Sequence, residues 1–298
     1  MKKLNFIIKC GLALLLLSFY SCESWLNVTP SDRLSEEMLF NDREGFVKAL
    51  NGVYIELNTN ELYGRNLTAG ALDVMGQYYS VASSSHAFYN YGGLVYTGND
   101  EKALFNNMWQ KCYAVIACCN TIIEKCDENK AGLSPVWRGS IKGEALALRA
   151  MLHFDMLRLF GPLTSELDKE SIPYQTNSDQ TVTPLLSGSE VVGLILDDLK
   201  NAVGLLKDTD PYFVEEEFSD TDLNYRRFRM NYFAAKGLMA RVQLWGGDKE
   251  KAAATAKEVI AEGQAEGAEF FPFVTNSEAT SSNPDRVFYS EVLFGTYH

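Results

Sequence analysis

After its first 21 residues the chain has no long apolar run, which limits how it can meet a membrane. A transmembrane helix needs about 20 consecutive apolar residues. The apolar stretch 6–17 is shorter than that, follows Lys2 and Lys3, and ends shortly before Cys22. This pattern is typical of a secretory signal peptide and not of a membrane span.

Positive charge is scarce as well. The chain carries 27 Lys and Arg residues against 39 Asp and Glu residues, which gives a formal net charge of -12 at pH 7. Binding to nucleic acid, and likewise to anionic lipid, depends on Lys and Arg side chains. The composition therefore argues against both kinds of partner and favours a neutral ligand such as a sugar.

The cysteines do not form an evident disulfide or metal site. Positions seven apart share one face of a helix but lie about 10 Å apart along its axis, beyond disulfide reach. No histidine or carboxylate is placed near them at the spacing of a metal site. We therefore expect buried free thiols, no metal and no cofactor. The four cysteines of this predicted helix are Cys112, Cys118, Cys119 and Cys126.

Patterns that indicate catalysis are also missing. Ser187 has no Gly-x-Ser-x-Gly surroundings for a nucleophile. Asp197 and Asp198 are adjacent on a predicted helix, so they point apart and cannot act as a glycosidase pair. Arg149 and His153 lie four residues apart within an apolar stripe, which favours a buried structural network over a charged site. The sequence predicts a protein that is not an enzyme.

The N-terminus resembles a bacterial lipoprotein box, since the apolar stretch runs through residues 18–21 into Cys22. In such a box Cys22 receives the lipid and becomes the first mature residue, so the chain is anchored to a membrane without spanning it. The expected organisation is a signal peptide over 1–21, a lipid-anchored tether over 22–33 and a helical domain over 34–298.

Helical spacing of apolar residues covers most of the chain that follows. Residues 147–161 and 235–247 resemble each other in their small residues, a central arginine and an aromatic residue before glycine. This favours a mainly α fold of degenerate tetratricopeptide-like helical hairpins with little β structure. Residues 58–100 lack the pattern and are expected to form long loops with one or two short helical turns. The expected helices are 41–57, 104–123, 137–160, 187–206, 230–245 and 249–262, and residues 287–294 alternate like a strand. The segment from Asn41 to Glu44 resembles a capping box, the segment from Ser187 to Glu190 is expected to cap the helix that follows it, and Asp248 is expected to cap 249–262.

Several motifs in one order resemble the SusD/RagB family of outer-membrane lipoproteins of Bacteroidetes. They are Gly143-Glu144-Ala145, Leu148-Arg149-Ala150, His153-Phe154 and Leu159-Phe160-Gly161-Pro162, with Trp109 and Tyr113 before them and residues 229–247 after them. One departure is Gly161-Pro162-Leu163-Thr164, where many members read Gly-Asp-Val-Pro. Family members are also considerably longer, so the chain is expected to be short at its C-terminus.

The resemblance implies an α-rich fold with a loop-rich ligand-binding face. It also implies an oligo- or polysaccharide ligand, a TonB-dependent SusC-like transporter as partner, and a lipid-anchored position at the outer membrane facing the cell exterior. Members of the family bind nutrients and catalyse nothing. Two alternatives stay open: a helical-repeat scaffold that binds only protein or peptide, and a surface glycosidase.

Residues 73–91 supply the groups that sugar recognition needs. Flat aromatic rings pack against the apolar face of a pyranose, and planar polar side chains bind its hydroxyl groups. The alternative is that many of these aromatic residues only pack the loops onto the helices. The candidate ligand-binding residues are Asp73, Gln77, Tyr78, Tyr79, His86, Tyr89, Asn90 and Tyr91.

Overall fold

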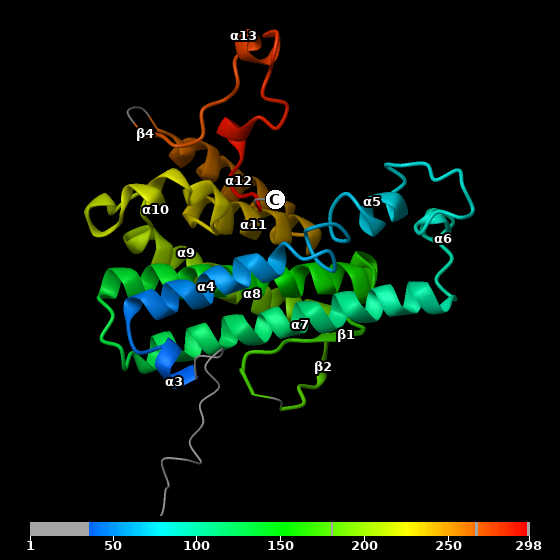
Figure 1. The fold of residues 1–298 in the computed structure, drawn as a ribbon, viewed down its shortest axis with the longest axis horizontal. Helices are drawn as coiled ribbons and strands as arrows, with labels where there is room; N and C mark the ends of the chain where they lie inside the picture. The colour runs from blue at the N-terminus through cyan, green and yellow to red at the C-terminus, as the bar shows by residue number, and fades with distance from the viewer. Residues whose placement is uncertain (1–35, 180, 266–267, 297–298) are drawn as a thin grey trace, which may run out of the picture. The chain divides into compact units, whose positions relative to one another are not determined.

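The computed structural model describes residues 36–179, 181–265 and 268–296, and these are mainly helical (Figure 1). Helix α3 (Glu36–Leu39) ends a separate N-terminal unit, and the chain from Phe40 onward forms one compact unit. The predicted signal peptide, Cys22 and the tether lie outside the described residues. Within the described ranges, no helix is long and apolar enough to pass through a bilayer.

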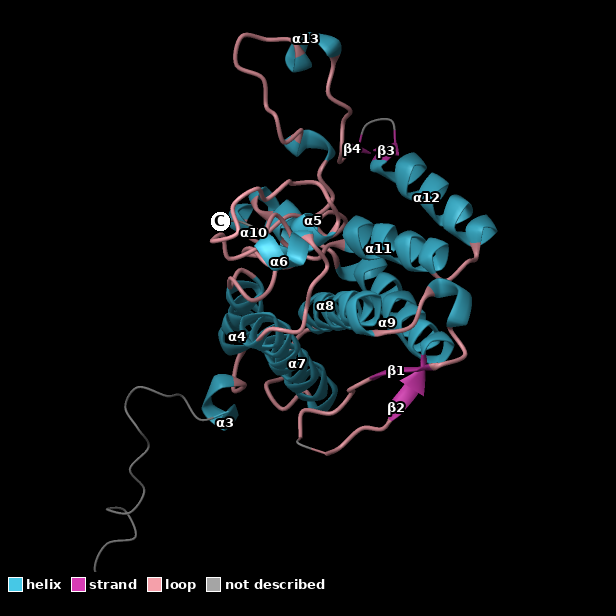
Figure 2. Cartoon of the chain, turned by 90° about the vertical axis from the view of Figure 1, so that its right-hand side faces the viewer, coloured by secondary structure: helices cyan, strands magenta, loops and turns pink. Residues whose placement is uncertain are grey.

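Long helices packed side by side make up most of the second unit. Helices that follow one another along the chain pack in sequence, α4 on α7, α7 on α8, α8 on α9, α9 on α11 and α11 on α12 (Figure 2). Short connections join α7 to α8 and α11 to α12, so each pair is a helical hairpin. The predicted mainly α fold of helical hairpins is confirmed. These helices are α4 (Arg43–Leu57), α7 (Asn99–Glu128), α8 (Pro135–Phe160), α9 (Gly188–Thr209), α11 (Tyr232–Trp245) and α12 (Lys249–Gly263).

Local residues set where these helices begin. Ser187 and Glu190 form a reciprocal capping box at the start of α9, and the Asp248 side chain caps α12, as predicted. Helix α4 is capped by Asp42 and not by Asn41, because the Asp42 carboxylate accepts a 2.8 Å hydrogen bond from the Gly45 amide. Helix α8 begins two residues before the predicted start, at Pro135, which needs no hydrogen bond from its nitrogen at the first helical position.

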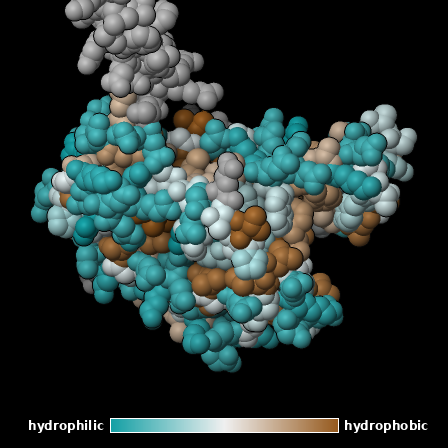
Figure 3. Space-filling model, turned by 90° about the horizontal axis from the view of Figure 1, so that it is seen from below, coloured by the Kyte–Doolittle hydropathy of each residue, from teal (hydrophilic) through white to brown (hydrophobic). Residues whose placement is uncertain are grey.

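Helix α8 is the centre of the core, and glycine lets α9 lie close against it. A Cβ atom added at Gly143 would stand 2.7 Å from Leu206 Cγ, and one at Gly139 would stand 2.6 Å from Thr209 Cγ2. Larger residues would therefore push the two helices apart. On the face seen in Figure 3, hydrophobic side chains gather in several patches among hydrophilic ones.

The predicted free thiols are confirmed on α7. The four cysteines are free, and those spaced by seven residues, Cys112, Cys119 and Cys126, are buried. The prediction of burial was wrong for Cys118, which is exposed because it lies off the face that the other three share. Burial raises the pKa of the Cys112 thiol well above its usual value and that of Cys126 to about 12. These thiols therefore pack as small apolar groups.

The predicted buried network around Arg149 is also present. The Arg149 guanidinium donates two hydrogen bonds of 2.7 Å to the carboxylate of Asp198 and one of 2.8 Å to the side-chain oxygen of Asn120. The Tyr174 hydroxyl donates to the same Asp198 carboxylate at 2.5 Å. The Asp198 carboxylate is buried and paired with Arg149, whereas Asp197 is exposed. The two carboxylates therefore do not act together.

The β structure is small, as expected, but one prediction was wrong. Residues 287–294 form no strand, since Phe288 has a left-handed φ of 51° and the Asp285 carboxylate accepts hydrogen bonds from the amides of Val287 and Tyr289. These bonds turn the chain into a short 3-10 helix, η5 (Tyr289–Glu291). Strand β1 (Glu170–Pro173) pairs antiparallel with β2 (Leu185–Ser187), and β3 (Gln264–Ala265) pairs with β4 (Ala268–Glu269). The other short elements are α5 (Ala71–Met75), α6 (Tyr89–Gly92), η2 (Thr164–Glu166), η3 (Glu215–Glu217), α10 (Asp220–Asn224), η4 (Arg226–Phe228) and α13 (Asn276–Ala279).

Candidate functional site

The segment 58–98, here called the loop segment, connects α4 to α7 and lies at the N-terminal end of α7 (Figure 1). It consists of turns and the two short helices α5 and α6. The prediction of long loops with one or two helical turns is confirmed. Since long loops on a helical scaffold often carry binding residues, this segment is the first place to look for a site.

A small apolar cluster of its own holds the loop segment together. Ala71, Val74 and Tyr91 are buried at its centre. The Tyr91 ring packs edge-on against Phe105 of α7 with centroids 6.0 Å apart, and Phe105 packs against Phe160 of α8 at 6.2 Å. Burial, followed by the nearby negative charges of Glu101 and Asp100, raises the pKa of Tyr91 to about 12. This cluster fixes the loop segment to the ends of α7 and α8.

A cleft of about 420 Å³ opens on the loop segment. That volume falls in the range of about 300–1,000 Å³ that is usual for small-molecule sites. Four of the eight candidate residues come together in it from two parts of the segment, the turn after α5 and the helix α6. Its lining residues are Gln77, Tyr79, Ser80, Val81, Tyr89, Asn90, Gly92, Gly93 and Val95.

The polar groups of this cleft are held in place by the protein. The Gln77 amide nitrogen donates to the Gly92 carbonyl at 3.0 Å, and the Asn90 amide nitrogen donates to the Glu101 carboxylate at 2.7 Å. The bond from Asn90 lowers the pKa of Glu101. Because both amide nitrogens are engaged, each side chain offers a ligand its amide oxygen, which accepts a hydrogen bond from a hydroxyl group. Tyr79 and Tyr89 are 53% and 42% exposed, so their rings are open to a ligand.

The other four candidate residues do not line this cleft. Tyr91 is only 2% exposed and packs inside the loop segment. It therefore has the packing role that was the alternative to ligand binding for these aromatic residues. Tyr78 is 80% exposed and projects from the segment, and Asp73 is half-buried on α5. The exposed His86 accepts a 3.1 Å hydrogen bond from the Phe88 amide at its Nδ1 atom.

The sequence did not point to the remaining lining residues. Ser80, Val81, Gly92, Gly93 and Val95 reach the cleft because the chain turns there, and no residue type among them indicates a ligand. Among the described residues that line the cleft there is no carboxylate. Across the described ranges, no group of three or more His, Cys, Asp or Glu side chains could hold a metal ion.

Comparison with known proteins identifies the family. A family model described as SusD-like, starch-binding and associating with the outer membrane matches residues 24–244. The chain belongs to the SusD-like family. SusD-like protein P2 of Formosa agariphila is 25% identical over 265 residues, which make up 87% of this chain and 46% of that protein. SusD-like protein P38 of the same organism is 27% identical over 199 residues, or 61% of this chain and 34% of that protein.

Solved structures of SusD-like proteins share the fold. A SusD-like carbohydrate-binding protein of Bacteroides vulgatus superposes with a TM-score of 0.62 at 23% identity, covering 80% of this chain and 47% of that one. A laminarin-binding SusD-like protein superposes with a TM-score of 0.59 at 16% identity, covering 80% and 48%. The chain thus spans about half the length of these proteins. The likeness supports the mainly α SusD-like fold assigned above.

Proposed function

We propose that this SusD-like chain binds an oligo- or polysaccharide in the cleft of the loop segment and does not cleave it. The observation that carries the proposal is the pairing of two exposed rings, Tyr79 and Tyr89, with the fixed amide side chains of Gln77 and Asn90 in one cleft. Rings of this kind stack on sugars, and amide oxygens bind their hydroxyl groups. The absence of a carboxylate among the described lining residues supports binding without hydrolysis.

The cellular setting belongs to the same proposal. Residues 1–21 would direct secretion, Cys22 would carry the lipid at the outer membrane facing the cell exterior, and residues 22–33 would tether the domain. The bound glycan would then pass to a TonB-dependent SusC-like transporter. The family description, which names association with the outer membrane, supports this setting. A Cys22→Ser variant should lose membrane association and lipid labelling, and retention of both would contradict the anchor.

The binding proposal is tested with a glycan array followed by calorimetry on the purified chain. We expect saturable binding to one polysaccharide class and no release of shorter sugars. The double variant Tyr79→Ala/Tyr89→Ala should bind about tenfold more weakly or worse, since each stacked ring contributes about 1 kcal/mol. The matched control is Tyr225→Ala, because Tyr225 is 59% exposed but lies outside the loop segment.

Each outcome has a definite meaning. Equal loss in the double variant and in Tyr225→Ala would contradict the assignment of the cleft. A folded chain that binds no glycan would favour a scaffold that binds only protein or peptide. Release of shorter sugars would favour a surface glycosidase.

A further inference from the structure

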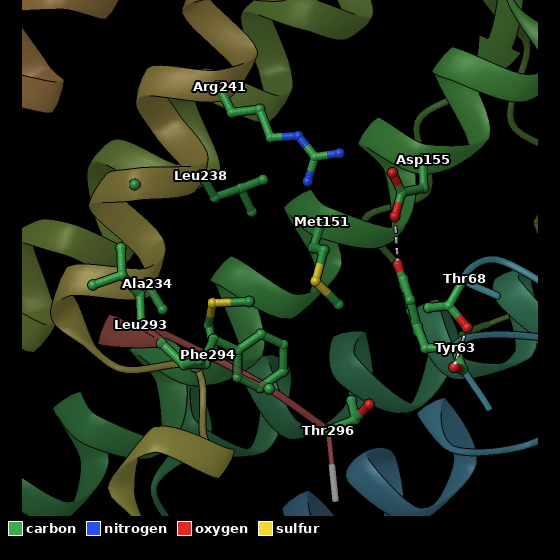
Figure 4. A pocket seen from close by; sticks show the side chains of 14 residues that line it. Tyr63, Thr68, Met151, Asp155, Ala234, Leu238, Arg241, Leu293, Phe294 and Thr296 are labelled. Atoms are coloured by element: carbon green, nitrogen blue, oxygen red, sulfur yellow. Dashed lines mark hydrogen bonds between the residues drawn. The ribbon is translucent and has the colours of Figure 1, made fainter. Parts of the chain in front are cut away.

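A second cavity lies away from the loop-segment cleft, between α8, α11 and residues 63–68. It has a volume of about 560 Å³ and adjoins another of about 450 Å³. Figure 4 shows Arg241 of α11 and Asp155 of α8 reaching toward the same space, with Met151 below them and Tyr63 hydrogen-bonded to Asp155. The two cavities share four lining residues, Tyr63, Thr68, Asp155 and Arg241, and together form one pocket, here called the α8–α11 pocket.

The charges in this pocket do not balance. The Asp155 carboxylate accepts a 2.7 Å hydrogen bond from the Tyr63 hydroxyl and forms a 2.9 Å ion pair with Arg158, so its two oxygens are both engaged. Arg241 has neither an ion pair nor a hydrogen bond within residues 36–179, 181–265 and 268–296, and its guanidinium lies 5.9 Å from the ring centre of Phe154. Arg241 is an exposed residue, so its guanidinium, which also lines the pocket, is open to pair with a ligand.

The rest of the larger cavity is mostly apolar. Hydroxyl-rich sugars need several hydrogen-bonding partners, and here Tyr63 already donates to Asp155 and Thr68 donates to the Tyr63 carbonyl. A mostly apolar cavity with one unpaired guanidinium matches a ligand with an apolar body and a single carboxylate. Its apolar lining residues are Met151, Met230, Ala234, Leu238, Val292, Leu293 and Phe294.

We propose that the α8–α11 pocket binds a small monocarboxylate with an apolar body. The carboxylate pairs with the Arg241 guanidinium, and the apolar part lies against Met151 and Leu238. Such a group can come from a fatty acid or from the C-terminal residue of an apolar peptide. This site does not depend on glycan binding in the loop-segment cleft, and the two can be tested separately.

The test compares acids with their uncharged amides by calorimetry on the purified chain. Octanoate stands for the fatty acid and N-acetyl-L-leucine for the peptide end. We expect at least one to bind saturably, and octanamide or N-acetyl-L-leucinamide, respectively, to bind roughly 10- to 100-fold more weakly, because a charge-assisted hydrogen bond is lost. Acetate, which has the charge but no apolar body, should bind more weakly than octanoate.

Arg241→Gln should weaken binding of the acid by the same factor and leave glycan binding unchanged. Arg286→Gln is the matched control, because Arg286 is exposed, as Arg241 is, but does not line the pocket. Failure of both acids to bind, equal binding of acid and amide, or full affinity in Arg241→Gln would overturn the proposal. If Arg241→Gln does not fold, the comparison of acid with amide on the unaltered chain still decides the question.

Discussion

His153 should make the chain lose stability in mild acid. Its ring is fully buried on α8 and stacks on Tyr174 with centroids 4.0 Å apart. The Nε2 atom accepts a 3.0 Å hydrogen bond from the Gln175 amide, which can only donate, so Nδ1 carries the proton and donates to the Arg149 carbonyl at 2.9 Å. A second proton, on Nε2, would break the bond to Gln175 and place a positive charge near the Arg149 guanidinium.

The size of the effect follows from the pKa difference between the folded and unfolded chains. Burial, together with the charge of Arg149, lowers the pKa of His153 from 6.5 to about 3. Above pH 6.5 the imidazole is neutral in both states, so its protonation does not change stability. Below pH 6.5 His153 takes up a proton in the unfolded chain but stays neutral in the folded chain. The free energy of unfolding therefore falls as the pH decreases toward about 3. Between pH 7.5 and pH 5.2 the loss from this group is about 2 kcal/mol.

This pH range separates His153 from the buried carboxylate of Glu144. Burial of Glu144 is outweighed by the charges of Arg229 and Arg226, so the pKa of Glu144 is lowered from 4.5. The stability that this carboxylate contributes is present above pH 4.5 and is lost at lower pH, as it becomes protonated. Its contribution to the change between pH 7.5 and pH 5.2 is therefore small.

The measurement is urea unfolding at pH 7.5 and pH 5.2, for the unaltered chain and for His153→Gln. The variant should be less stable at both pH values but should lose most of the pH dependence, because a glutamine does not titrate. The exposed His86→Gln serves as the matched control and should keep the pH dependence of the unaltered chain. A change below about 0.5 kcal/mol in the unaltered chain, or an undiminished change in His153→Gln, would refute the reasoning.

Two further predictions concern the packing of the helices. Gly143→Ala should destabilise the chain by about 1–3 kcal/mol in urea unfolding, because the new Cβ would meet Leu206. By contrast, the Cβ of Gly204→Ala on α9 would meet nothing within 4 Å, so this variant should be about 0.5–1 kcal/mol more stable than the unaltered chain. The reverse order would contradict the close packing of α8 on α9. Arg226→Gln should cost about 3–5 kcal/mol in the same measurement, since it leaves the fully buried Asp210 carboxylate without its bidentate partner at 2.9 and 2.7 Å. A cost below about 1 kcal/mol would show that Asp210 does not need this pair.

The amino-acid sequence alone was sufficient to locate the long helices and two of their caps. Apolar spacing within α8 and α9 and the capping residues Ser187 and Asp248 act over three or four positions, so local chemistry decides them. The family could be recognised for a related reason, since its motifs follow one another along these helices. The strand expected over 287–294 failed because the Asp285 side chain competes for two backbone amides there.

The roles of the loop tyrosines depended on contacts between distant segments. Tyr89 and Tyr91 lie two residues apart in similar surroundings, yet Tyr89 faces the cleft and Tyr91 is buried against Phe105 of α7. The α8–α11 pocket depends even more clearly on contacts between distant segments. Asp155 and Arg241 are far apart in the chain and come to one cavity because α8 and α11 both pack on α9 and contact each other. Burial and charge pairing depend on which helices pack together. The pattern of a few neighbouring residues in the sequence does not determine which helices those are.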